Sequence, residues 1–372
     1  MNEELQYLIA LTSIRGIGAI KARLLIETFG SARAVLDADA KSLTVLQNVG
    51  QLILQYRGAE LMKRAEQEMR FIDDHHIRSM ILGQAGYPRR LQQCPDAPVL
   101  LYGLGNVNLD SAHTISIVGT RACTQYGRDI VARLLADMKE EVPDLVVMSG
   151  LAFGIDISAH QAALDLGIPT VGVVAHGLDR IYPSMHRRTA AEMIDRGGAV
   201  VTEYMTGTEP IAGNFLARNR IIAGLSDAVV VAESREKGGS LVTASIAIDY
   251  NREVYAFPGR VGDDRSKGCN RLIRLNRAAL ITSAKDMLES LGWLSNKKKA
   301  TKAVQTVIPF DDPNLSPNGQ RIITLLTQHG DLRLSQLRDM TGMEQAQLLE
   351  ELLALELEDH IRNCPGGLYQ LK

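Results

Sequence analysis

The residues best suited to chemistry in this sequence stand in glycine-rich and basic turns that each follow a short apolar run. The turns comprise Gly119-Thr120-Arg121, Ser149-Gly150, the stretch from Phe215 to Arg220, Lys237-Gly238-Gly239-Ser240 and Pro258-Gly259-Arg260. Glycine lets a backbone approach a ligand closely, and exposed amides at helix starts attract anions. Several such turns side by side predict an extended groove for an anionic ligand rather than a single phosphate site.

Basic residues gather in the same half of the chain. Arg218 and Arg220 stand in a predicted helix, and a denser cluster surrounds a later apolar run: Arg252, Arg260, Arg265, Lys267, Arg271, Arg274 and Arg277. Phe215, three residues before Arg218, offers a flat face of the kind on which unpaired bases stack in single-strand binders. Two structural alternatives stay open here: a solvated charged face for the arginines and a place in the core for the phenylalanine.

The motifs of several enzyme classes are absent from the sequence. It contains neither the G-x-x-x-x-G-K-[ST] of phosphate-binding loops nor the G-x-G-x-x-G of dinucleotide sites, and no G-x-S-x-G nucleophile turn. Asp156 and His160 are four residues apart on a predicted helix, so their side chains can meet. We interpret Asp156 as a helix-start residue that accepts backbone hydrogen bonds and His160 as a structural histidine. These absences leave P-loop hydrolysis and dinucleotide-dependent chemistry unsupported, and we expect no cofactor or metal.

Seven short runs must position the turns. They read HTISIVG, DLVVMSG, PTVGVVAHG, GAVVTEY, DAVVVAES, EVYAFPG and AALITSA, and they alternate with helical stretches from residue 113 to residue 284. Such nearly continuous apolar runs are typical of parallel strands that are buried on both faces and joined by helices. The predicted fold class is α/β, with an extended Rossmann-like, doubly wound, mostly parallel sheet. Ligands of these sheets bind beyond the carboxyl ends of the strands, where the turns stand.

The residues before the sheet read as short helices. Apolar spacing predicts helices at 5–14 and 19–29, around the turn Arg15-Gly16-Ile17-Gly18. This pattern favours a helix-hairpin-helix (SAM-like) module, whose turn either holds a phosphate or only packs two helices together. We assign residues 1–105 to this module and to an extended connector that is broken by prolines, and residues 106–294 to the sheet.

The end of the chain reads as a linker and a compact module. Residues 295–314 predict a linker, in which we favour a solvated tether over a DNA contact for the cluster Lys297–Lys299. Residues 315–372 predict a winged helix with a hairpin at Gly366-Gly367. Its third helix is acidic, and neither Lys nor Arg occurs from Asp339 to Ile361. Because DNA phosphates would repel this helix, we expect the module to dock a protein rather than to read DNA.

Composition limits the class of protein. The 372 residues include 41 Lys and Arg and 43 Asp and Glu, and 45% of them are hydrophobic. These values exclude a mainly disordered chain and one that is basic throughout. Four widely spaced cysteines, an N-terminus without a signal-peptide pattern, and no apolar run of about 18 residues lead us to expect a cytoplasmic protein without a membrane segment.

Together the motifs resemble the DNA-processing protein A family (DprA, also called Smf). The matching segments follow the family's order: SIVGTR, MSGLAFGIDISAH, GLDRIYP, FLARNRIIAGLSDAVVVAES, GGSLVTASIA, AFPGR and GCNRLI. The resemblance implies a non-enzymatic, homodimeric protein that binds and protects single-stranded DNA during natural transformation (competence). It also implies that the protein loads the RecA recombinase onto this DNA.

The resemblance extends to individual residues. The DNA-binding residues it implies are Gly119, Thr120, Arg121, Gly150, Phe215, Arg218, Asn219, Arg220, Lys237, Gly239 and Ser240. The dimer interface is expected near Gly268 to Ile281, with Asn270, Leu272, Ile273 and Leu280. A contact with RecA is expected on the helix from Leu241 to Tyr250.

Two other functions compete with this one. Nucleotide phosphoribohydrolases of a related Rossmann type carry P-G-G-x-G-T-x-x-E, whereas the chain reads Lys237-Gly-Gly-Ser-Leu-Val-Thr-Ala-Ser245 and lacks the glutamate needed for acid–base chemistry. A scaffold that docks proteins through its terminal modules is the third hypothesis, and the strand-end turns argue against it.

Overall fold

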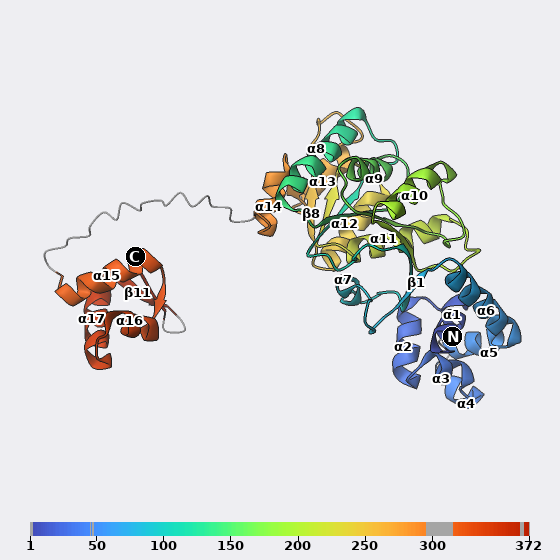
Figure 1. The fold of residues 1–372 in the computed structure, drawn as a ribbon, viewed down its shortest axis with the longest axis horizontal. Helices are drawn as coiled ribbons and strands as arrows, with labels where there is room; N and C mark the ends of the chain where they lie inside the picture. Colours follow the sequence, from blue (N-terminus) through green and yellow to red (C-terminus); the bar gives the residue numbers. More distant parts are fainter. Residues whose placement is uncertain (1–2, 45, 47, 295–314, 365–367, 372) are drawn as a thin grey trace. The chain divides into compact units, whose positions relative to one another are not determined.

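The computed structural model of the chain describes residues 3–44, 46, 48–294, 315–364 and 368–371 (Figure 1). By its internal contacts the chain divides into two units, Met1–Ser295 and Asn296–Lys372. The predicted linker 295–314, with Lys297–Lys299, and the predicted turn at Gly366-Gly367 lie outside the described residues.

A nine-stranded sheet forms the centre of the first unit. Its strands are β1 (Arg78–Ile81), β2 (Leu100–Gly105), β3 (His113–Val118), β4 (Leu145–Ser149), β5 (Thr170–Val173), β6 (Ala199–Thr202), β7 (Ala228–Val231), β8 (Glu253–Ala256) and β9 (Ala279–Leu280). The order is β1-β2-β6-β5-β4-β3-β7-β8-β9. Every pair from β6 to β9 is parallel, so the predicted large, mostly parallel, Rossmann-like sheet is confirmed, with the seven predicted runs as β3 to β9.

The sequence prediction missed two strands. β1 lies in a region predicted to be helical, and β2 lies in the segment predicted as an extended connector, which also contains the short helix α7 (Arg89–Gln92). β2 pairs antiparallel with both β1 and β6, so this segment joins the sheet. The prolines at 88, 95 and 98 precede β2 and do not interrupt it, because Leu100 is its first residue.

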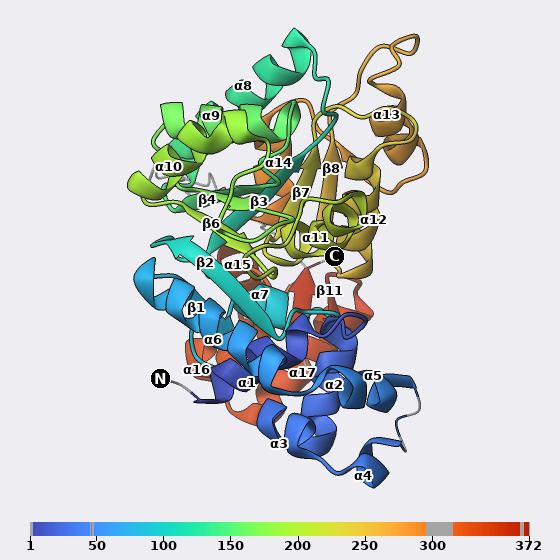
Figure 2. The ribbon, with the colours of Figure 1, turned by 90° about the vertical axis from the view of Figure 1, so that its right-hand side faces the viewer.

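Helices cover both faces of the sheet (Figure 2). One face carries α8 (Gln125–Glu141), α9 (Ile155–Asp165), α10 (Arg187–Asp195) after the short 3₁₀ helix Ser184–His186, and α14 (Ala284–Leu291). The other face carries α7, α11 (Ala212–Gly224), α12 (Gly239–Asp249) and α13 (Lys267–Arg274). Residues that alternate along β7 supply both cores: Val230 packs toward α8, and Val229 packs toward α11. Burial on both faces explains why the strand runs are continuously apolar.

The order of the strands reverses beside β3. From β3 the chain proceeds outward through β4, β5 and β6, and it then returns to place β7 on the other side of β3. The loops that leave β3 and β7 therefore run in opposite directions and open a crevice at the carboxyl ends of these two strands. This switch point is where open α/β sheets bind their ligands.

Six helices precede the sheet: α1 (Glu3–Ser13), α2 (Ala19–Phe29), α3 (Ala32–Asp37), α4 (Ala40–Thr44), α5 (Asn48–Tyr56) and α6 (Ala59–Asp74). α1 and α2 match the two predicted helices, and Gly16 in the turn between them has φ +92°, a left-handed conformation that favours glycine. Arg64 and Glu68 of α6 form an ion pair of 3.0 Å, and both side chains bind the loop after β6. Glu68 accepts a hydrogen bond of 2.9 Å from the Thr206 amide, and Arg64 donates one of 2.8 Å to the Thr206 hydroxyl.

The second unit has its own core. Its helices are α15 (Pro317–His329), α16 (Leu334–Thr341) and α17 (Gln345–Leu357), and its sheet is β10 (Leu332–Arg333), β12 (Leu368–Leu371) and β11 (Ile361–Cys364) in that order. All of its strand pairs are antiparallel. Leu326, Leu337 and Leu352, one from each helix, are almost fully buried together.

Candidate nucleic-acid interface

A cleft of about 620 Å³ opens at the switch point between β3 and β7. Nine of the eleven predicted DNA-binding residues line it: Gly119, Thr120, Arg121, Phe215, Arg218, Asn219, Lys237, Gly239 and Ser240. They come from three segments that are far apart in the sequence, namely the loop after β3, helix α11 and the loop that leads into α12. The fold therefore brings most of the predicted site together, whereas Gly150 and Arg220 do not line this cleft.

The loop after β3 is held rigidly. The Thr120 amide donates to the Glu233 carbonyl oxygen over 2.8 Å, and the buried Glu233 carboxylate accepts from the Thr124 amide and hydroxyl over 2.8 and 2.5 Å. Gly154 packs directly against this loop: it has φ +77°, and a Cβ at this position would lie 2.1 Å from the Thr120 carbonyl oxygen. This packing presents Arg121 to solvent from a fixed backbone.

An aromatic ring and a cation meet at the mouth of the cleft. The Arg121 guanidinium lies 5.1 Å from the centre of the Phe215 ring, and the Tyr182 ring lies 5.9 Å from it. Arg121 is exposed, Phe215 is half-buried, and 45% of Tyr182 is exposed. The pair offers a flat apolar surface for a base next to a positive charge for a phosphate. Tyr182 was not among the predicted residues, although the GLDRIYP segment that contains it was.

Arg218 lies beneath this surface and is only 3% exposed. Its Nη1 donates to the carbonyl oxygens of Gly150, over 2.7 Å, and Val173. Burial raises the pKa of the Asp156 carboxyl, and the neighbouring Arg218 opposes that rise; burial likewise lowers the pKa of Arg218 to about 10. Arg218 thus holds the ends of β4 and β5 in place beside Asp156, and it is not presented to solvent as a phosphate ligand would be.

Gly150 makes room for Arg218. A Cβ at this position would lie 2.5 Å from Asp156 Oδ2 and 2.7 Å from Arg218 Nη1. The predicted role of Gly150 in the site therefore becomes an indirect one, because the glycine borders the buried ion group behind the cleft.

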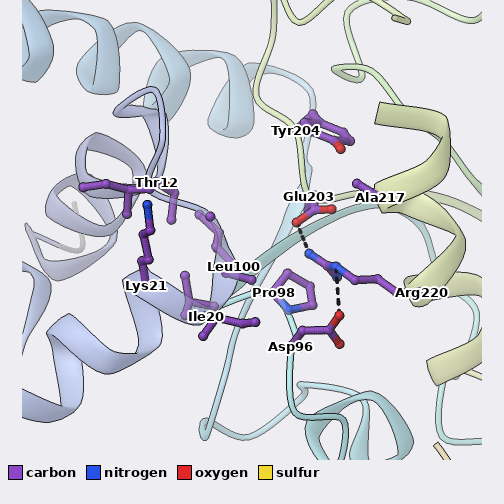
Figure 3. Close-up of a pocket in the computed structure, with 14 residues that line it drawn as sticks. Thr12, Ile20, Lys21, Asp96, Pro98, Leu100, Glu203, Tyr204, Ala217 and Arg220 are labelled. Carbon is purple, nitrogen blue, oxygen red and sulfur yellow. Dashed lines mark hydrogen bonds and ion pairs between the residues drawn. The ribbon is translucent and has the colours of Figure 1, made fainter. Parts of the chain in front are cut away.

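Arg220 belongs to a different cavity, of about 470 Å³, between the α1–α2 turn and the end of β6 (Figure 3). In this view its guanidinium reaches from α11 to a point between Glu203 and Asp96, at 2.5 and 3.8 Å. Lys21 lines the same cavity and donates to the Gly16 carbonyl oxygen over 2.9 Å. Because two carboxylates already offset its charge, Arg220 adds little positive potential to the cleft.

The loop before α12 forms the opposite wall of the cleft. The Ser240 hydroxyl donates to Ser234 Oγ over 2.9 Å, and α12 begins after Gly238 without a side-chain cap. In its first turn the Leu241 amide donates to the Gly238 carbonyl oxygen over 3.1 Å, and Gly239 and Ser240 line the cleft. Lys237 is exposed above this turn. The cleft also includes Arg235, a second exposed cation that the prediction missed because it stands within the charged run Glu233-Ser-Arg235-Glu-Lys237.

The predicted dimer residues have different environments. Leu280, in edge strand β9, is 50% exposed. Leu272 and Ile273 belong to α13; Leu272 is buried in the core, and Ile273 is partly buried against it. Asn270 holds the Gly259 backbone through two hydrogen bonds of 3.0 and 3.1 Å. Only Leu280 of these four is openly presented at the edge of the sheet.

His160 and Asp156 are not hydrogen-bonded to each other in the described structure. The Thr170 hydroxyl donates to the Val147 carbonyl oxygen over 2.9 Å, so it accepts from His160 Nδ1, which lies at 2.7 Å. Burial lowers the pKa of His160 to about 3. The ring is therefore neutral at physiological pH and holds β5 in place through Thr170.

This neutral histidine predicts a loss of stability in acid. Below pH 6.5 the unfolded chain takes up a proton that folded His160 refuses until about pH 3, so stability falls as the pH falls through this window. The expected loss is about 2 kcal/mol between pH 6.5 and 5. Denaturant titrations at several pH values, followed by the fluorescence of the single tryptophan, Trp293, measure this loss. The His160→Gln variant should show a smaller decrease of the free energy of unfolding with falling pH. An equal decrease in this variant would contradict the assignment.

The sequence of the chain matches a known family across the region that forms the cleft. A profile of the DNA recombination-mediator protein A family matches residues 78–292, which begin at β1 and include the whole nine-stranded sheet. This match covers more than half of the chain. The chain belongs to this family.

Individual relatives agree with the family assignment. The DNA processing protein DprA of Streptococcus pneumoniae is 42% identical over 224 residues, which are 58% of this chain and 78% of that protein. Protein Smf of Escherichia coli K12 is 34% identical over 292 residues, which are 77% of this chain and 75% of that protein. The chain therefore shares its ancestry with DNA-processing proteins.

Solved structures of the family have the same fold. The X-ray structure of DprA from S. pneumoniae superimposes with a TM-score of 0.62 at 32% identity, over 76% of this chain and 97% of that one. A DprA from Helicobacter pylori, described for its single-stranded DNA binding mode, gives a TM-score of 0.52 at 30% identity over 58% and 97% of the two chains.

Within the described residues, none of the helices combines the length and apolar character needed to cross a membrane.

Proposed function

We propose that the chain binds single-stranded DNA in the cleft between β3 and β7, without catalysing a reaction, and delivers it to the RecA recombinase. The observation that carries this proposal is the placement of exposed Arg121 beside the Phe215 ring at the switch point of the sheet. An unpaired base can stack on the ring while its phosphate meets the guanidinium. Duplex bases are already stacked, so the same pair favours single strands.

The charge around the cleft supports a polyanionic ligand. Arg121, Arg235 and Lys237 are exposed and line it, and the start of α12 forms part of its wall. The carboxylate that lines the cleft, Asp156, lies buried next to Arg218. This arrangement supports binding rather than hydrolysis, because neither an exposed carboxylate nor a histidine is among the described residues that line the cleft.

The terminal modules supply the remaining proposals. Residues 1–105 act as a helix-hairpin-helix (SAM-like) module, residues 106–294 as the DNA-binding domain, and residues 315–372 as a winged helix joined by the linker 295–314. The left-handed turn between α1 and α2 supports the first assignment, and the three helices with a small antiparallel sheet support the last. Acidic α17, the third helix of that module, favours a protein partner over DNA.

Assembly follows from the exposed edge of the sheet. Proteins usually cover or pair the edge strands of their sheets. Edge strand β9 carries the exposed Leu280, and Leu275, shortly before it, is exposed as well. We assign the homodimer contact to this edge and the RecA contact to neighbouring α12, where Val242 is exposed. Such a dimer presents two DNA clefts, one from each copy, and so serves recombination during natural transformation.

The decisive experiment is a fluorescence-anisotropy titration of the full chain with a labelled single strand and with the matching duplex at several salt concentrations. We expect tighter binding to the single strand. Its logarithmic salt dependence should have a slope of about −0.7 for each phosphate neutralised. Equal affinity for the duplex, or release of the base from a nucleoside monophosphate, would contradict the proposal.

A further inference from the structure

A second cavity opens at the same edge of the sheet, beyond the end of β8. It has a volume of about 750 Å³, and Tyr126, Pro258, Arg260 and Ser266 are among the residues that line it. None of these residues belongs to the cleft between β3 and β7. In the strand order β8 follows β7 directly, so the second cavity lies one strand further along the edge.

Tyr126 is held with its ring open to solvent. It stands in the first turn of α8, whose N-cap Thr124 is fixed by two hydrogen bonds to the buried Glu233 carboxylate. At the other end, its hydroxyl donates to the Pro258 carbonyl oxygen over 2.8 Å. Although both ends are fixed in this way, 45% of the residue is exposed. A fixed and exposed aromatic ring loses little entropy when a base stacks on it.

The cavity that Tyr126 lines contains one exposed cation, Arg260, and one carboxylate, Asp263. Arg260 follows β8, whereas Arg128 on α8 is turned to the Gln125 side chain and the Cys123 carbonyl oxygen. The nearby acids are engaged: Asp263 accepts from the Ser266 hydroxyl over 2.8 Å, and Asp264 pairs with Lys267 at 2.5 Å. The second cavity thus contains an exposed aromatic ring and an exposed cation, as the cleft does with Phe215 and Arg121.

The two cavities border each other. The loop from Gly119 to Thr124 lines the cleft at its start and the second cavity at its end. A second link joins the segment after Ser266, which lines the second cavity, to the cleft: the Gly268 amide donates to the carbonyl oxygen of Ser234, a residue that lines the cleft, over 2.8 Å. A chain of nucleotides that leaves the cleft past this loop therefore meets Tyr126 next.

We propose that Tyr126 is a second stacking platform for the same strand of DNA, with Arg260 as its phosphate partner. The inference rests on the proposed function, since it extends the single-strand path from β7 to β8. It predicts that oligonucleotides long enough to span both cavities gain affinity from Tyr126, whereas those that fill only the cleft do not.

The test uses the full chain and thymidine oligonucleotides of increasing length, from about 4 to about 16 nucleotides. Tyr126→Ala should weaken binding of the long strands roughly 5- to 150-fold, the effect of removing one base-stacking contact, and leave the short strands unchanged. Tyr126→Phe keeps the ring but loses its hydroxyl bond to Pro258, so it should retain most of the affinity for long strands. Tyr56→Ala is the matched control, because Tyr56 is similarly exposed (43%) but lies on α5.

Salt dependence separates the two parts of the subsite. Tyr126→Ala should not change the salt slope, whereas Arg260→Ala should reduce its magnitude by about 0.7 for long strands only. An unchanged affinity of Tyr126→Ala for long strands overturns the inference and leaves the cleft intact. A loss that is equal at all lengths also overturns it, because Tyr126 would then act on the cleft itself. Failure of the unaltered chain to bind any single strand would instead refute the proposed function, and this inference with it.

Discussion

Replacement of Arg121 by alanine is expected to lower the affinity for single-stranded DNA about 10- to 100-fold, the range for a lost hydrogen bond to a charged group. The Arg121 side chain is exposed, and its guanidinium lies over the Phe215 ring. Because the side chain is not part of the core, its loss should remove a phosphate partner without disturbing the fold. The magnitude of the salt slope should decrease by about 0.7, and the loss should be the same for all base sequences. Anisotropy titrations over a range of salt concentrations measure both effects.

Two variants serve as controls for this result. Arg70→Ala removes an exposed arginine that lies on α6 and pairs only with Glu66 among the ion pairs of the described residues, so it should bind DNA normally. Phe215→Ala should lose about 1–3 kcal/mol of binding free energy with no change in salt slope, because it removes stacking and no charge. A loss in Arg121→Ala that depends on the base sequence would mean that Arg121 reads base edges rather than phosphates.

Replacement of Arg218 by methionine is expected to destabilise the fold rather than to remove a DNA contact. The guanidinium is buried, serves the carbonyl oxygens of Gly150 and Val173, and faces the buried Asp156 carboxylate. Removal of one partner of a buried ion group leaves the other charge uncompensated and costs about 3–5 kcal/mol. Denaturant unfolding should reveal this loss through Trp293, which packs against the core between the sheet and α8.

The matched comparison is Arg121→Met, the same chemical change at an exposed position. It should alter the free energy of unfolding by no more than about 0.5 kcal/mol. The double variant Arg218→Met with Asp156→Leu removes both charges and should recover part of the lost stability, since an apolar pair can replace a buried ion pair. A stable Arg218→Met protein that nevertheless fails to bind DNA would make Arg218 a direct ligand and contradict our assignment.

The sequence was most informative where burial leaves a simple pattern. The seven apolar runs are β3 to β9, and the central strands among them are apolar because they are covered on both faces, whereas both residues of edge strand β9 are exposed. β1 was missed because its four residues, Arg-Ser-Met-Ile, carry neither alternation nor a continuous apolar run. β2 does contain such a run, Leu-Leu-Tyr, but the prolines before it favoured a connector.

For the site, the resemblance to the family predicted which residues take part but not where their side chains point. Successive residues of a helix are rotated by about 100°, so Arg218 and Arg220 of α11 point about 200° apart. This rotation places Arg218 under the cleft, with Phe215 close by, and sends Arg220 to the cavity that contains Glu203. The helical period could have separated these two arginines, whereas the burial of Arg218 depends on Asp156, 62 positions earlier in the sequence, which no local pattern reveals.

The most direct test of the central claim is ultraviolet crosslinking of a thymidine oligonucleotide to the full chain, followed by mass spectrometry of the crosslinked peptides. Base stacking in the cleft predicts crosslinks to the peptides that contain Phe215 and Tyr182, the two rings at its mouth. These crosslinks should disappear with an excess of unlabelled single strand and persist with duplex. Crosslinks confined to the helices before β1 or to the second unit, with none in the cleft, would contradict the account.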